Sequence, residues 1–98
     1  MQEKKLHIKA TDERMMPTYS NNIQITHSGE EFVLDMFSVY PPQGQLISRV
    51  VVSPQHAKRL AGALQENIRK YEDKYGVIPD KGVPFNIEGM NVGKNDAE

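Results

Sequence analysis

Hydrophobic residues in the second half of the chain recur at the spacing of an α-helix. Between residues 54 and 75 they fall alternately three and four positions apart, on an arc about 100° wide, as expected of one buried face. These positions are Ala57, Leu60, Ala61, Leu64, Ile68, Tyr71 and Tyr75. Ser53 is a suitable N-cap, and Pro54 suits the first helical position, where no amide hydrogen is needed. Gly76, with Pro79 soon after it, is the usual stop signal. The pattern predicts one long amphipathic helix over residues 54–75.

Three runs before this helix have the apolar pattern of β-strands. The first, residues 22–26, alternates between polar and apolar positions; the second, residues 32–40, is apolar on both faces. The third covers residues 46–52. A Ser28-Gly29 pair predicts a two-residue turn after the first run, because glycine tolerates the positive φ that such hairpins require. Prolines and a glycine over residues 41–45 predict the second turn.

These turns set a register for the predicted sheet. Pairing His27 with Glu30, and Tyr40 with Leu46, places nine apolar side chains on one face, as a one-sided core demands. The nine are Ile23, Ile25, Phe32, Leu34, Met36, Tyr40, Leu46, Val50 and Val52. We therefore predict the α+β class, with a three-stranded antiparallel β-meander followed by one long amphipathic helix packed on this face.

The ends of the chain differ in composition from this core. Residues 1–5 are polar and are expected to be disordered, whereas residues 6–10 alternate and predict a short fourth strand at the edge of the sheet. Residues 77–98 are rich in Gly, Pro, Asn and charge, which predicts a mobile C-terminal tail. The predicted α+β domain is single and spans residues 6–76.

The same register leaves apolar side chains on the second face of the sheet, which one helix cannot cover. An exposed apolar patch of this kind normally marks an interface, and two-fold dimers dominate among small homo-oligomers. We predict a homodimer through this face; the alternative is that the terminal segments fold over it. Asp35 and Arg49 lie there diagonally across two strands, as a partly buried or a solvated ion pair. The predicted interface residues are Val33, Asp35, Phe37, Val39, Ile47, Arg49 and Val51.

Composition narrows the class of protein. A folded unit of about 70 residues buries only about 60% of its unfolded surface, and oligomerisation commonly helps such domains. The chain has no cysteine, which excludes a disulfide framework, and it has no apolar run of membrane-spanning length, so we expect a cytoplasmic protein. The net charge of −1 argues against a protein whose main task is to neutralise nucleic-acid phosphates.

Charge is nevertheless uneven, because the sheet region is acidic and the helix is mildly basic. The free amides at the helix start, together with nearby cations, could receive an anion such as a phosphate. The alternative is that Ser53 caps these amides and the cations keep the helix soluble. The candidate anion or nucleic-acid contacts are His56, Lys58, Arg59, Arg69 and Lys70.

No pattern in the sequence predicts catalysis. His7, His27 and His56 lie on separate elements without the close ligand pairs of a metal site. Ser53 and His56 lack a third orienting group, and no glycine-rich phosphate loop is present. We therefore predict no enzyme activity, no metal and no cofactor.

Several stretches together resemble a small bacterial and archaeal family. They are Tyr19-Ser20-Asn21, His27-Ser28-Gly29-Glu30-Glu31-Phe32-Val33-Leu34-Asp35, Ser48-Arg49-Val50-Val51-Val52-Ser53-Pro54-Gln55-His56-Ala57-Lys58-Arg59-Leu60, Ala63-Leu64-Gln65-Glu66-Asn67-Ile68 and Tyr71-Glu72. The family is a domain of unknown function, number 3467, and the resemblance covers about residues 6–76. It implies no activity, substrate or cofactor.

The layout is also similar to that of the single-stranded-DNA-binding transcriptional coactivators of the positive-cofactor-four type. Those proteins run an antiparallel meander into a helix and bind DNA through strands rich in Lys, Arg and aromatic residues, whereas this sheet has Arg49 and little else. Fold alone does not imply function. We predict a small homodimeric binding or adaptor module for an unidentified protein partner. The alternative is a nucleic-acid-binding protein of the coactivator type that uses the basic helix face.

Overall fold

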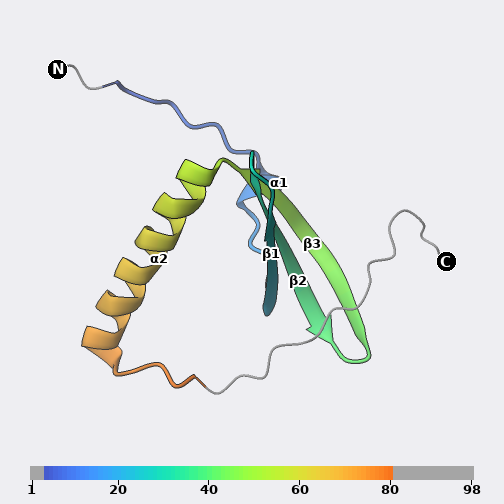
Figure 1. The fold of residues 1–98 in the computed structure, drawn as a ribbon, viewed down its shortest axis with the longest axis vertical. Coiled ribbons are helices and arrows are strands. Elements are labelled where there is room, and N and C mark those ends of the chain that lie inside the picture. Colours follow the sequence, from blue (N-terminus) through green and yellow to red (C-terminus); the bar gives the residue numbers. More distant parts are fainter. Residues whose placement is uncertain (1–3, 81–98) are drawn as a thin grey trace.

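The computed structural model describes residues 4–80; the predictions for residues 1–3 and for 81–98 of the C-terminal tail lie outside the described residues. The elements are a short helix α1 (Asp12–Met15), strands β1 (Asn22–His27), β2 (Phe32–Tyr40) and β3 (Gln43–Val52), and a long helix α2 (Pro54–Tyr75). The strands form one antiparallel sheet in the order β1-β2-β3 (Figure 1). The predicted α+β layout, a meander followed by one long helix, is confirmed.

Helix α2 begins and ends where the sequence predicts. The Oγ atom of Ser53 accepts a hydrogen bond of 3.1 Å from the backbone N–H of His56, and Pro54 occupies the first turn. At the other end Gly76 has a φ of +101° and donates its N–H to the carbonyl of Glu72. This φ favours glycine over any residue with a Cβ, so the chain leaves the helix here.

The β1–β2 loop is longer than predicted. His27 pairs with Phe32, so four residues form the loop instead of two. Within the loop, Ser28 donates its backbone N–H to the carbonyl of Glu31 over 2.9 Å. Gly29 lacks the positive φ that a two-residue turn requires. The predicted register is therefore wrong by two residues, and because this shift is even, each side chain of β1 keeps its predicted face.

The β2–β3 turn is shorter than predicted. Pro41 and Pro42 form the whole turn, so Tyr40 pairs with Gln43 and not with Leu46. Gln43, Gly44 and Gln45, which were expected to be part of the turn, pair with β2 instead. Strand β3 consequently has ten residues.

A β-bulge divides β3 into two parts. On the side of α2, Asp35 lies directly opposite Arg49, so the predicted diagonal relation of this pair is wrong. On the side of the turn, Phe37 lies opposite Leu46, which leaves Ile47 as the extra residue. The bulge therefore moves Leu46 to the opposite face from the one predicted.

The pairing defines two faces of the sheet, which we call face A and face B. Face A carries Ile23, Ile25, Phe32, Leu34, Met36, Tyr40, Val50 and Val52. Face B carries Gln24, Val33, Asp35, Phe37, Val39, Leu46, Arg49 and Val51. Face A is the predicted helix-facing surface without Leu46. Face B is the predicted dimer surface with Leu46 in place of Ile47, the bulge residue.

The buried core of the described chain is small. Among the described residues, the buried apolar side chains are Leu34 and Phe37, which are 8% and 4% exposed, and Asp35 is 5% exposed. All three lie on β2, the central strand of the sheet.

Helix α2 does not pack on face A. Figure 1 shows the helix diverging from the sheet below the point where β3 ends, and none of its residues is buried. The connection between β3 and α2 is the single residue Ser53, whereas connections in layered units usually need roughly two to six residues. The predicted packing of the helix on its own sheet is thus wrong, because so short a connection does not let the chain reverse over the sheet.

The N-terminal segment does not form the predicted fourth strand. Residues 4–10 have no regular structure and are exposed. The unpredicted helix α1 follows, and the Oγ1 atom of Thr11 caps it by accepting the backbone N–H of Arg14 over 3.1 Å. The sequence signal for α1 was a Thr followed by two acidic residues, a common helix start.

The residues just before β1 hold on to β2 through side chains. The amide Nδ2 of Asn21 donates to the carbonyl of Val39 over 3.0 Å, and its Oδ1 accepts the N–H of the same residue over 2.9 Å. The hydroxyl of Ser20 donates to the carbonyl of Phe37 over 2.8 Å. Phe37 pairs with Asn22, the first residue of β1, and Val39 lies just beyond it, so these bonds extend the attachment of the chain to β2 past the strand and satisfy the backbone groups of Val39.

Candidate interaction surface

The apolar stripe of α2 is uncovered along the whole helix. It begins one residue after the sheet ends and repeats at three- and four-residue spacing because its sequence follows the helical period. Its large side chains are between 40% and 65% exposed; they are Leu60, Leu64, Ile68, Tyr71 and Tyr75. At the end of the helix the rings of Tyr71 and Tyr75 lie 4.9 Å apart. A stripe of this width normally lies against another apolar surface.

Face A is the second uncovered apolar surface. On its edge strands, Ile23 and Ile25 are more than half exposed, and Val50 is 39% exposed. Its central residue, Leu34, is buried. Face A therefore has a covered centre and open apolar edges on both flanking strands.

Face B offers less apolar surface than the sequence predicted. Asp35 and Phe37 are buried within the chain, while Val33, Val39 and Ile47 are intermediate. The exposed predicted interface residues are Val51, at 53%, and Arg49. Asp35 and Phe37 are therefore not open surface in the single chain. The dimer interface itself stays a prediction.

Asp35 and Arg49 form a two-pronged ion pair across β2 and β3. The Oδ1 of Asp35 lies 2.6 Å from Nε of Arg49, and its Oδ2 lies 3.1 Å from Nη2. This geometry is the strong form of a charge-assisted hydrogen bond. The hydrogen bonds from Arg49, opposed by burial and aided by its charge, lower the pKa of Asp35 below its ordinary value of 3.8. The same contacts raise the pKa of Arg49.

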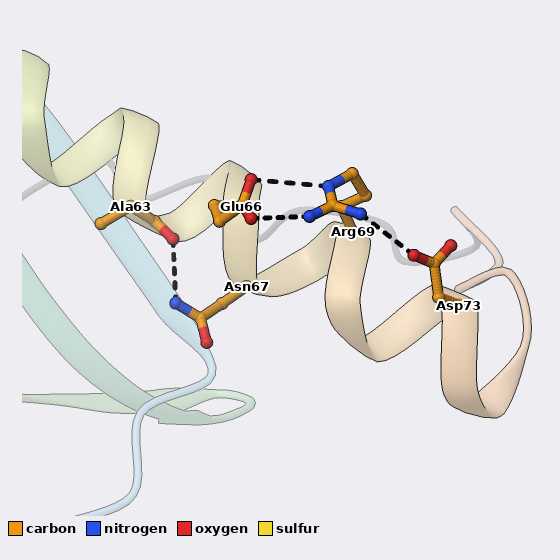
Figure 2. A network of polar contacts seen from close by, with 5 residues as sticks. All are labelled: Ala63, Glu66, Asn67, Arg69 and Asp73. Atoms are coloured by element: carbon orange, nitrogen blue, oxygen red, sulfur yellow. Dashed lines mark hydrogen bonds and ion pairs between the residues drawn. The ribbon is translucent and has the colours of Figure 1, made fainter.

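Arg69 is occupied by two carboxylates of its own helix. Figure 2 shows its guanidinium between Glu66 and Asp73, with Nη2 2.6 Å from Glu66 Oε2 and Nη1 3.1 Å from Asp73 Oδ2. In the same view, Asn67 extends away from this network and donates its Nδ2 to the carbonyl of Ala63 over 3.0 Å. The outer face of α2 is thus charged but locally neutralised.

The predicted anion-binding residues do not form one patch. His56 has its backbone N–H bonded to the cap residue Ser53, so one of the amides proposed for an anion is already taken. By helical geometry Lys58, Arg59 and Lys70 lie on the outer side of α2 with Arg69, and the carboxylates of Glu66 and Asp73 lie among them. Lys74 lies beside the apolar stripe, with Nζ 5.3 Å from the ring centroid of Tyr75.

The described residues contain neither a metal-binding cluster nor a membrane-spanning helix. No group of three or more His, Asp or Glu side chains is arranged to hold a metal ion within residues 4–80. No helix in that range is long and apolar enough to cross a bilayer. Within residues 4–80 the features that remain for function are therefore the apolar stripe of α2 and face A.

Together these features define a small α+β protein, built from an antiparallel meander and one long helix, with two apolar surfaces uncovered. The chain belongs to the family described as protein of unknown function (DUF3467), whose model matches residues 1–80. This confirms the family resemblance seen in the sequence. Comparison of the chain with curated proteins and with solved structures finds no match. The similarity in layout to the DNA-binding coactivators stays a prediction.

The structural role of the Tyr19-Ser20-Asn21 stretch, which is part of the family resemblance, was not predicted from the sequence. Asn21 and Ser20 bind the backbone of β2. Asn and Ser side chains commonly bond nearby backbone groups, but here the partners are 17 and 18 residues away. Only the fold reveals such a distant contact.

Proposed function

We propose that this protein is a binding or adaptor module without catalytic activity, which works as a cytoplasmic homodimer and holds a protein partner. The observation that carries the proposal is the apolar stripe of α2, which has no buried residue in the single chain. Large exposed apolar patches normally mark interaction sites. The absence of cysteine is compatible with a reducing compartment.

The free energy available from covering this stripe is large for so small a protein. Its five large side chains are on average about half exposed. Fully burying one such side chain contributes about 1.5–3 kcal/mol, so covering the exposed halves contributes roughly 4–7 kcal/mol. The net stability of a whole domain is only about 5–15 kcal/mol. Association is therefore expected to decide whether the chain is stably folded.

The alternative function is nucleic-acid binding by the basic face of α2. Phosphate binding needs several cations that are free to meet the backbone. Of the five predicted contacts, Arg69 is paired with Glu66 and Asp73, and Arg59 and Lys70 lie on the same side of the helix as these carboxylates. These contacts favour protein association over phosphate binding.

Sizing with light scattering tests the dimer. The expected mass is twice the chain mass of 11.1 kDa at micromolar concentration. A strictly monomeric, stably folded chain at high concentration would overturn the proposal. A Leu64→Asp variant, which charges the stripe, is expected to be monomeric or unfolded, whereas the matched Gln65→Asp variant, one residue along on the polar side, is expected to stay dimeric.

A gel-shift titration separates the two candidate functions. Single-stranded and duplex nucleic acids are titrated at two salt concentrations, with no binding expected if the protein is an adaptor. Tight binding that weakens steeply with salt would favour the nucleic-acid alternative, since phosphate contacts depend strongly on ionic strength.

A further inference from the structure

We infer that the two copies exchange helices, so that α2 of each copy lies on face A of the other. The inference rests on the proposed homodimer and specifies the surfaces that form its contact. Face B, the surface predicted from the sequence, then remains outside the helix contact.

The two surfaces match in character and in length. The stripe of α2 and the open edges of face A are both apolar surfaces left uncovered in the single chain. A helix of 22 residues is about 33 Å long at 1.5 Å per residue. The ten-residue strand β3 also spans about 33 Å at 3.3 Å per residue. One helix can therefore cover the full length of one sheet.

The helix of the same chain is poorly placed to do this. Ser53 alone joins β3 to α2, and its extended backbone, with φ −70° and ψ 159°, leads straight from the strand into the helix. A layer packed on a sheet lies about 10 Å from it. One residue advances the chain by about 3.8 Å, which is less than this spacing, so α2 starts at the edge of the sheet and not in a layer above it. A second copy has no such tether.

The buried area is sufficient for a stable dimer. A helix about 33 Å long and about 10 Å wide covers roughly 330 Å² of a sheet. Exchange makes two such contacts, and each contact buries both partners, which gives roughly 1,300 Å² in total. Stable protein–protein interfaces start at about 1,200 Å².

Packing of the two α2 helices against each other alone would cover less of the apolar surface of the dimer. It would cover the stripes of the two copies but leave Ile23 and Ile25 on face A exposed to water. Exchange covers both surfaces with the same contact. It is also closed by two-fold symmetry, so each stripe and each face A is used once within the dimer.

Cysteine cross-linking tests the contact directly, because the natural chain contains no cysteine. Two differently tagged chains are co-expressed, one with Ile25→Cys on face A and the other with Leu60→Cys, Leu64→Cys or Ile68→Cys in turn. A disulfide needs Cα atoms within about 7 Å, so three helix positions allow for the unknown crossing point. Val50→Cys provides a second position on face A. Circular dichroism checks that each variant folds.

The expected result is a covalent heterodimer from at least one pair, several-fold more abundant than with the matched Gln24→Cys chain, whose side chain lies on face B. A disulfide within one Ile25→Cys, Leu64→Cys double variant would mean that the helix closes on its own sheet. Leu64→Cys cross-linking only to itself would mean helix-on-helix packing. Either result overturns exchange while the homodimer stands, whereas a monomeric mass by light scattering overturns both.

Discussion

Asp35 lies almost entirely out of water on the central strand, where it is held by two hydrogen bonds from Arg49. The pair joins β2 to β3 across positions that face each other directly. Because a displacement of either strand would leave a buried carboxylate without a partner, the pair favours one register over its neighbours.

The ionisation of Asp35 is the most direct test of this pair. Its pKa in the folded state lies below 3.8 because Arg49 stabilises the carboxylate. The pair therefore stabilises the fold above about pH 4, and this contribution is lost as the pH falls through the folded-state pKa. Carboxyl-carbon NMR titration is expected to give a midpoint below 3.8, and the Arg49→Gln variant is expected to raise it. An unchanged midpoint in the variant would contradict this account.

Asn21 gives a second prediction at the residue scale. Asn21→Ala removes both hydrogen bonds to Val39 and is expected to cost about 1–3 kcal/mol, since each bond contributes about 0.5–1.5 kcal/mol. Asn21→Asp keeps the acceptor for the N–H of Val39 but loses the donor to the Val39 carbonyl. Its cost in unfolding free energy is therefore expected to be at least that of one hydrogen bond. Urea denaturation at fixed protein concentration measures both. An alanine variant as stable as the wild type would show that the contact is unimportant.

The sequence predicted the structural role of some single residues and not of others. Asp35 and Arg49 were predicted as a pair because opposite charges interrupt two apolar strands. Asn21 was not predicted as a structural residue, because its partner becomes a neighbour only after β2 folds against β1. Contacts between distant residues need the register, and the register was wrong by two.

At the scale of elements, α2 can be tested without disturbing any contact of the single chain. Gly62 lies on its outer side, and a Cβ added there meets nothing within 4 Å. Gly62→Ala is expected to stabilise the protein by about 1 kcal/mol, and the matched Ala63→Gly variant to destabilise it by about as much. Thermal and urea unfolding measure both changes. A Gly62→Ala variant with weaker dimers would mean instead that the partner's backbone approaches this glycine.

The elements themselves were largely predictable, but their pairing was not. The bounds of α2 follow from Ser53, Pro54 and Gly76, whose effects are local. The hairpins depend on loop lengths, and here one loop gained two residues while the other lost three. Apolar alternation specifies the face of each strand but tolerates any even shift, so β1 and the part of β3 next to α2 kept their predicted faces while their partners changed. Next to the turn the shift is odd, and Leu46 changed face.

At the scale of the whole molecule, two substitutions on opposite faces of the sheet distinguish the possible dimer surfaces. Ile25 on face A and Val51 on face B are similarly exposed, at 59% and 53%. Ile25→Asp is expected to halve the mass measured by light scattering, because it places a charge under the partner's helix. Val51→Asp is expected to leave the dimer intact. The reverse outcome would restore the face predicted from the sequence.

Helix packing was the part of the fold that the sequence could not assign. The stripe of α2 shows that the helix must be covered, and face A shows that the sheet must be covered. Neither pattern says whether the two surfaces belong to one chain or to two. The deciding feature is the length of the connection, and a single Ser53 is compatible with contact between chains.

This one-residue connection has a consequence for how the protein forms. In an exchanged dimer the stripe of α2 and face A are covered only when two chains associate. The last step of folding is therefore second order in chain concentration. Mass action then makes thermal stability rise with protein concentration. At low chain concentration a larger fraction of the protein would then be incompletely folded monomer. Raising expression would increase the amount of dimer more than proportionally.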